Sequence, residues 1–125
     1  MSLISRIIIG LIAFIHLYIL WFEMFAWTSR GPEIFKALPK DIFEPTKAMA
    51  ANQGLYNGFL AAGLIWTYFI IDPVWKKKIS LFFLSCVAIA GIYGAFTIET
   101  KILFIQTIPS IIAIILIFVS PKPKN

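Results

Sequence analysis

Two side chains in the first apolar segment of this sequence have the chemistry to move a proton. His16 and Glu23 lie seven residues apart, a spacing that returns nearly to the same face of an α-helix. An imidazole and a carboxyl group placed in this way can pass a proton between them or exchange one with a bound molecule. We therefore take His16 and Glu23 as candidate catalytic residues.

Amide and hydroxyl side chains occur in the other apolar segments at matching depths. If each segment crosses a membrane as a helix, the rise of ~1.5 Å per residue places His16 near the midplane. The same calculation places Glu23 and the amide and hydroxyl side chains of the other segments about 4 to 10 Å outward from the midplane, in one leaflet. The shared depth predicts one ligand-binding pocket. Its predicted lining consists of His16, Glu23, Asn52, Gln53, Asn57, Tyr93 and Gln106.

Each of these residues also has a simpler interpretation. The three amides of the second segment are suited to hydrogen bonds between helices, and a single histidine is often a satisfied core residue. Glu23 is harder to explain in this way. A carboxyl group inside hydrocarbon is costly unless it has a partner or access to water.

The segments that must position these residues are four long apolar runs. They cover about residues 4–27, 48–71, 79–98 and 102–120, and each is long enough to cross ~30 Å of hydrocarbon as a helix. Sixty per cent of the chain is hydrophobic and only 14% is charged, more apolar surface than a soluble domain of this size can bury. We predict a single all-α domain over residues 1–125, an integral membrane up-down four-helix bundle.

Polar connections separate the runs and carry most of the charge. The longest connection, residues 28–46, contains Gly31, Pro32, Pro39 and Pro45 among charged and apolar residues, so we predict a loop that lies on the membrane surface. The net charge is +5. Because the lysines and arginines sit in short gaps between apolar runs, they favour contact with membrane lipids and argue against nucleic acid.

The distribution of basic residues predicts the orientation. One side of the membrane would carry six of them, Arg6, Lys76, Lys77, Lys78, Lys122 and Lys124, and the other five, Arg30, Lys36, Lys40, Lys47 and Lys101. The dense cluster close to helix ends places both termini in the cytoplasm and the protein in the plasma membrane.

Two further predictions concern the packing of the helices through small residues and the lack of a metal site. Stripes of small residues on the second and third runs let helices approach closely, either within one chain or in a homo-oligomer. The glycines concerned are Gly54, Gly58, Gly91 and Gly94. A single histidine and a single carboxyl group inside the runs do not make a metal site, and we predict no metal and no cofactor.

Four short stretches of the sequence resemble a known family that covers almost the whole chain. The segment 50–63 reads Ala-Ala-Asn-Gln-Gly-Leu-Tyr-Asn-Gly-Phe-Leu-Ala-Ala-Gly, and it is accompanied by His16-Leu17-Tyr18, Glu23-Met24-Phe25, and Ala90-Gly91-Ile92-Tyr93-Gly94-Ala95. Together they are similar to the domain of unknown function 1304, a family of small four-helix membrane proteins. The resemblance implies a fold and a membrane location, and it assigns no activity and no catalytic residue.

Four functions are open at this point. The first is the binding of a lipid-like molecule, such as a quinone or an isoprenoid, in the outer-leaflet pocket. The second is a membrane enzyme that moves a proton on such a molecule through His16 or Glu23. The third is a small proton-coupled transporter, and the fourth is a structural or assembly factor without a ligand.

Overall fold

The fold consists of helices and the turns between them. A computed structural model describes residues 1–120, and within them it has five α-helices and no strand: α1 (Leu3–Phe25), α2 (Trp27–Ile34), α3 (Lys47–Trp66), α4 (Pro73–Thr97) and α5 (Ile108–Val119). A 3-10 turn, Lys40–Ile42, precedes α3, and a π-helical segment, Leu103–Thr107, leads directly into α5. The prediction of an all-α domain is confirmed for this part of the chain.

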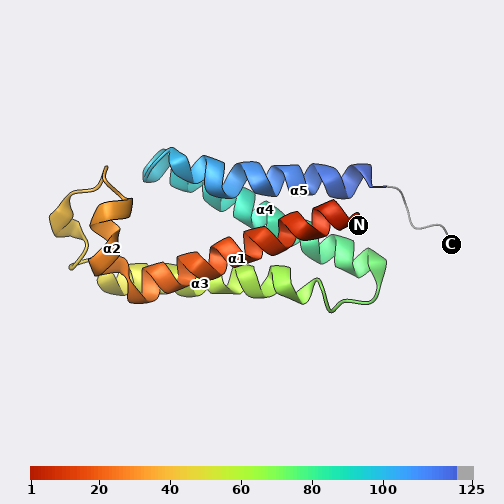
Figure 1. The fold of residues 1–125 in the computed structure, drawn as a ribbon, viewed down its shortest axis with the longest axis horizontal. Helices are drawn as coiled ribbons and strands as arrows, with labels where there is room; N and C mark the ends of the chain where they lie inside the picture. The colour runs from red at the N-terminus through yellow and green to blue at the C-terminus, as the bar shows by residue number, and fades with distance from the viewer. Residues whose placement is uncertain (121–125) are drawn as a thin grey trace.

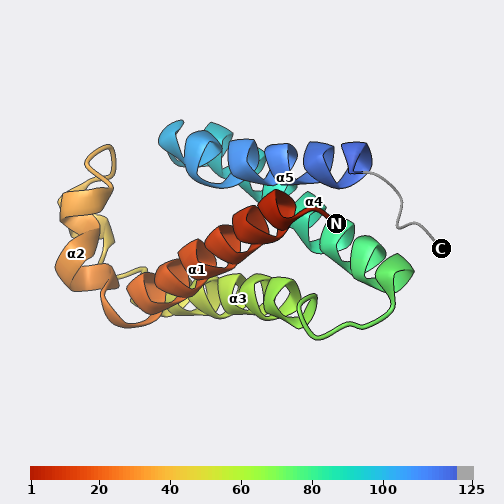
Figure 2. The ribbon, with the colours of Figure 1, turned by 45° about the vertical axis from the view of Figure 1, so that its right-hand side comes forward.

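The long helices form two pairs that meet at one end. α1 runs antiparallel beside α3, and α4 runs antiparallel beside α5 with its π-helical segment (Figure 1). In both views the pairs lie close together near the N-terminus and separate toward the end that carries α2 (Figure 2). The fold therefore has a tight end and an open end.

The hydrophobic core occupies the tight end. Its fully buried members come from the first half of α1, the end of α3, the middle of α4 and the end of α5: Ile9, Ile12, Ala13, Leu64, Leu84, Val87, Ala113 and Ile117. Beyond the core, large apolar side chains point outward along the helices, such as Phe14, Phe82 and Ile115. Two of the described helices, α1 and α4, are long and apolar enough to cross a membrane.

The connection that was predicted to be a surface loop contains a helix. α2 occupies Trp27–Ile34 although Gly31 and Pro32 lie inside it. Gly31 is buried against the ring of Phe43, where any side chain would collide. The close packing therefore requires glycine at this position. The connection contains a helix where the sequence predicted a loop, and its location on the membrane surface stays a prediction.

Other boundaries also differ from those predicted. α3 ends at Trp66, whereas the predicted run continues to residue 71. α4 begins at Pro73, six residues before the predicted run, because the Asp72 carboxylate accepts a hydrogen bond from the Trp75 backbone N–H at 2.8 Å and caps the helix. The last predicted run is divided into the π-helical segment and α5, which follows it with Pro109 in its first turn. Proline has no N–H to donate to the preceding turn, so the regular pattern of helical hydrogen bonds changes here. Lys122 and Lys124, which we assigned to the cytoplasmic side, lie outside the described residues.

Candidate functional site

A cavity of about 590 Å³ opens between the two helix pairs at the open end. Its walls come from the end of α1, the first half of α3, the end of α4 and the π-helical segment, and residues from the α2 end of the molecule contribute as well. The lining residues are Glu23, Trp27, Phe35, Leu38, Ile42, Thr46, Met49, Ala50, Gln53, Tyr56, Asn57, Leu60, Ala90, Tyr93, Gly94, Thr97, Ile98, Ile102 and Gln106.

A hydrogen bond between α1 and α3 positions Glu23, whose carboxyl group is the one that lines this cavity among residues 1–120. The Asn57 amide nitrogen donates to Glu23 Oε2 at 3.0 Å and also to the Gln53 backbone carbonyl at 3.0 Å. Within residues 1–120, Asn57 is the one hydrogen-bond partner of the Glu23 carboxyl group. The second carboxyl oxygen therefore has no protein partner in this part of the chain and is available to a bound molecule.

Close approach of the two helices makes this bond possible. A Cβ atom at Gly54 would lie 3.0 Å from the Glu23 Cβ and 3.0 Å from the Leu20 carbonyl oxygen. Real Cβ atoms are rarely so crowded, so only glycine lets α1 and α3 approach this closely without a shift. The position of Glu23 on α1 therefore depends on a glycine in the neighbouring helix, α3.

Four other polar side chains of the cavity are without intramolecular hydrogen bonds. The amides of Gln53 and Gln106 and the hydroxyls of Tyr56 and Tyr93 make none within residues 1–120. They come from α3, the π-helical segment and α4. The cavity therefore offers a carboxyl oxygen, two amides and two hydroxyls, surrounded by a wall that is largely apolar.

An aromatic cap is formed by Trp27, Phe35 and Phe43 together with Phe22, and Trp27 and Phe35 also line the cavity. The Trp27 ring lies 5.8 Å from that of Phe35 and 5.0 Å from that of Phe43, measured between centroids. Trp27 Nε1 donates to the Thr46 hydroxyl at 3.0 Å. These contacts join the start of α2 to the residues that precede α3.

The cap is also attached to the turn between α4 and the last helical run. Lys101 Nζ donates to the Ile34 carbonyl, and it lies 5.1 Å from the centre of the Phe35 ring. The same ammonium group is 3.0 Å from Glu99 Oε2. One lysine therefore connects α2 with the second helix pair across the open end.

Two of the predicted site residues lie elsewhere. His16 is fully buried, and its Nδ1 donates to the Ile12 carbonyl at 2.8 Å, whereas Nε2 has no partner within residues 1–120. It is not among the residues that line the cavity, and no hydrogen bond joins it to Glu23 in the described chain. Asn52 is exposed and donates to the Ala48 carbonyl of its own helix at 2.9 Å.

The structure brings the other five predicted residues to one cavity. These are Glu23, Gln53, Asn57, Tyr93 and Gln106. A ligand-binding role for any of them stays a prediction. Sequence reasoning missed the residues of the cap and its neighbours, although the apolar residues scattered through the connection, such as Phe35, Leu38 and Ile42, were a signal that it packs against something.

The four glycines of the predicted small-residue stripes all face helices of the same chain. Gly54 and Gly58 lie against α1, at Met24 and Leu20 respectively. Gly91 lies against Gln106, and Gly94 lies against Ile102. These contacts give the stripes a role within one chain, and a homo-oligomer through them stays a prediction. In residues 1–120 no group of three or more His, Cys, Asp or Glu side chains could hold a metal ion.

Comparisons with known proteins give a family and a distant relative. The family described as "Protein of unknown function (DUF1304)" matches residues 10–118. The "Uncharacterized protein YpaA" of Lactococcus lactis subsp. lactis (strain IL1403) is 28% identical over 117 residues, which cover 92% of this chain and 97% of that protein. No solved structure matches the chain significantly. Since the match extends over most of the sequence, the chain belongs to the DUF1304 family of proteins of unknown function.

Proposed function

We propose that this chain is an integral protein of the plasma membrane that crosses the bilayer four times and binds a lipid-like molecule in the cavity of its outer half. The polar head of that molecule, of the size of a quinone ring or an isoprenoid head group, would meet Glu23 and the free amides. Its apolar part would leave between the diverging helix pairs. The cavity beside Glu23 is the observation that carries this proposal.

The outer surface supports the membrane location. Side chains as large as Phe14, Phe25 and Phe96 are 70%, 73% and 88% exposed, and exposure of many large apolar side chains is unfavourable in water. α1 and α4 satisfy the length and composition for a crossing. α3 has 20 residues, about 30 Å at 1.5 Å per residue, and the amides of Gln53 and Asn57 that lower its hydrophobicity lie at the cavity.

Four crossings place the two ends of the molecule on opposite sides of the membrane, and this arrangement is testable by labelling. In a Cys86→Ser background, Lys40→Cys should react from outside the cell with a membrane-impermeant thiol reagent, and Lys77→Cys should react only after the membrane is opened. A reporter fused after Asn125 should be active in the cytoplasm. External labelling of both cysteines would contradict a single orientation with cytoplasmic termini.

The dimensions and lining of the cavity support a small-molecule ligand. Its volume of about 590 Å³ falls in the range of known ligand sites, ~300–1,000 Å³, in which apolar walls surround a few polar groups. If the polar side chains served only to join helices, they should be paired with one another. Instead, Gln53, Tyr93 and Gln106 make no side-chain hydrogen bonds within residues 1–120.

Glu23→Gln tests whether the carboxyl group holds the head of the ligand. The substitution keeps the shape of the side chain and an oxygen that can accept from Asn57, and it removes the charge and one strong acceptor. Loss of a hydrogen bond to a charged group costs ~1.5–3 kcal/mol, so the amount of lipid-like molecule retained per protein, measured by extraction and mass spectrometry, should fall about tenfold or more. The thermal midpoint in detergent should change little.

Glu33→Gln is the matched control, because Glu33 is an exposed carboxyl group on α2 that does not line the cavity. Its retained ligand should equal that of the wild type. If Glu23→Gln also retains the wild-type amount, the carboxyl group serves only as a contact between α1 and α3, and the binding proposal fails at its central residue.

A further inference from the structure

The cavity at the open end has an acidic group in its wall and no basic group to balance it. Glu23 is the carboxyl group that lines it, and no lysine, arginine or histidine of residues 1–120 does so. Glu23 makes no salt bridge in this part of the chain either. A carboxylate inside hydrocarbon is unfavourable without a partner, so a bound molecule with a positive charge would supply what the described protein does not.

Three basic residues adjoin lining residues in the sequence, but none of them lines the cavity. Lys36 and Lys47 are exposed. The ammonium group of Lys101 lies 3.0 Å from Glu99 Oε2 and donates to a backbone carbonyl of α2. Lys101 is therefore engaged in holding α2 to the second helix pair, and it does not neutralise Glu23.

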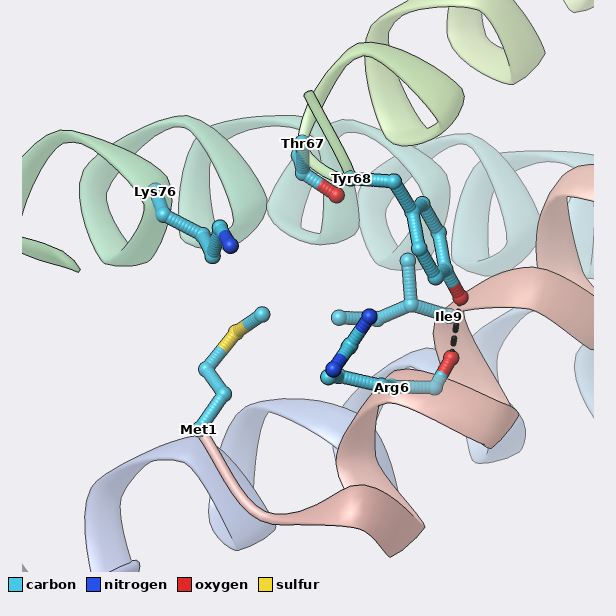
Figure 3. Close-up of a pocket in the computed structure, with 6 residues that line it drawn as sticks. All are labelled: Met1, Arg6, Ile9, Thr67, Tyr68 and Lys76. Atoms are coloured by element: carbon cyan, nitrogen blue, oxygen red, sulfur yellow. Dashed lines mark hydrogen bonds between the residues drawn. The ribbon is translucent and has the colours of Figure 1, made fainter. Parts of the chain in front are cut away.

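A second hollow, at the tight end, carries the opposite charge but has no room for a ligand. Arg6 and Lys76 are among the residues that line it (Figure 3). The Tyr68 hydroxyl donates to the Arg6 backbone carbonyl, as the dashed line in Figure 3 indicates, and the ring lies 5.7 Å from the Arg6 guanidinium carbon. The space left is too small for a water molecule. The cavity beside Glu23, at about 590 Å³, is the one of the two that can admit a ligand.

The free polar groups of that cavity match an ammonium group, which donates up to three hydrogen bonds and accepts none. The second oxygen of Glu23 and the amide oxygens of Gln53 and Gln106 are acceptors that the described chain does not use. The hydroxyls of Tyr56 and Tyr93 can accept as well. A carboxylate or phosphate head group would instead face Glu23 with like charge.

Aromatic rings in the wall are a second feature that favours a cation. Trp27, Phe35, Tyr56 and Tyr93 line the cavity, and the face of an aromatic ring attracts a positive charge. Phe35 already makes such a contact within the chain, with the Lys101 ammonium group 5.1 Å from the centre of its ring. A carboxyl group among several rings suits an ammonium head group, and the apolar remainder of the wall suits an apolar chain.

We infer that the cavity beside Glu23 selects amphiphilic cations, in which an ammonium head group is attached to an apolar chain. The ammonium group would donate to the second Glu23 oxygen and lie beside the aromatic rings, and the chain would occupy the apolar part of the cavity. The inference rests on the proposed function, the binding of a lipid-like molecule at this site, and it names the chemical class of that molecule.

The test compares three molecules that share one isoprenoid chain. At neutral pH farnesylamine carries an ammonium group, farnesol a hydroxyl and farnesoic acid a carboxylate. Each is added to the purified protein in an uncharged detergent, and its affinity is taken from the rise in thermal midpoint that a ligand of the folded state produces. Farnesylamine should bind about tenfold or more tightly than farnesol, because charge-assisted hydrogen bonds are about twice as strong as neutral ones. Farnesoic acid should bind least.

Glu23→Gln tests whether the carboxyl group provides this preference. The affinity for farnesylamine should fall about tenfold or more, to that for farnesol, which should itself change much less. Glu33→Gln, which removes an exposed carboxyl group outside the cavity, should keep the preference of the wild type. If Glu23 serves only as a contact between α1 and α3, Glu23→Gln should weaken the binding of all three molecules equally, and that result would overturn the inference.

Ala90→Trp separates this inference from the proposed function. Because Ala90 lines the cavity, an indole ring there should weaken the binding of all three molecules. Equal wild-type affinities that Ala90→Trp abolishes would overturn the preference for cations and leave ligand binding in the cavity intact. If none of the three molecules raises the midpoint of the wild type, or if Ala90→Trp leaves their binding unchanged, both proposals fail.

Discussion

Gly54→Leu is expected to lower the free energy of unfolding by about 3 kcal/mol, the upper end of the cost of overpacking. A Cβ atom at this position would lie 2.8 Å from Met24 Cγ and 3.0 Å from both the Glu23 Cβ and the Leu20 carbonyl oxygen. The carbonyl belongs to the backbone of α1, so it cannot turn aside. The helices would have to separate, and the Asn57–Glu23 hydrogen bond would be lost with them.

Ala62→Leu is the control for this prediction. Ala62 lies two turns further along α3 and is exposed, so the same added volume should leave the thermal midpoint in detergent nearly unchanged. Gly58→Leu should have an intermediate effect, because the atoms that it would meet belong to the flexible Leu20 side chain. Equal midpoints for Gly54→Leu and Ala62→Leu would mean that the α1–α3 contact does not require glycine.

Helix positions were predictable here because apolar runs and polar gaps alternate so clearly. Residues 3–25 form a helix where the first run was predicted, and the polar groups at matching depths, Glu23 and Asn57 among them, do lie on facing helices. Depth along a helix follows directly from the rise per residue. The direction in which a side chain points around the helix axis is harder to predict when few polar residues define one face of the helix.

His16 and Asn52 illustrate that second difficulty. His16 is seven residues from Glu23, a separation that falls slightly short of two full turns, and its imidazole can satisfy one nitrogen with the Ile12 carbonyl of its own helix. Asn52 neighbours Gln53 in sequence but is rotated by about 100° around the axis, and it also bonds to its own helix. Local hydrogen bonds of this kind compete with a shared site and leave no mark in the sequence.

The aromatic cap could not be derived from local sequence either. Trp27, Phe35 and Phe43 pack together only because Gly31 lets the Phe43 ring approach the backbone of α2. Gly31 and Pro32 on their own indicate a break in a helix. The divergence of the helix pairs, which creates the cavity, depends on packing over the whole bundle and not on any one segment.

Ala90→Trp is expected to abolish most of the binding that we propose for the cavity. Ala90 lies on α4 and lines the cavity beside Tyr93 and Gly94. An indole ring there would occupy a substantial part of the volume of about 590 Å³ that the ligand needs. The amount of lipid-like molecule retained per protein should fall about tenfold or more, which corresponds to ~1.4 kcal/mol of lost affinity. Because the ring fills an existing space, the thermal midpoint should not fall.

Ile89→Trp provides the matched comparison. Ile89 precedes Ala90 on the same helix, is 67% exposed and does not line the cavity, so the same indole ring should leave the retained ligand unchanged. A ligand held on the outer surface of α4 would give the opposite order, with Ile89→Trp the more damaging variant. Equal retention in both variants would mean that the molecule binds outside the cavity, and the contacts at Glu23 would then serve only to join α1 to α3.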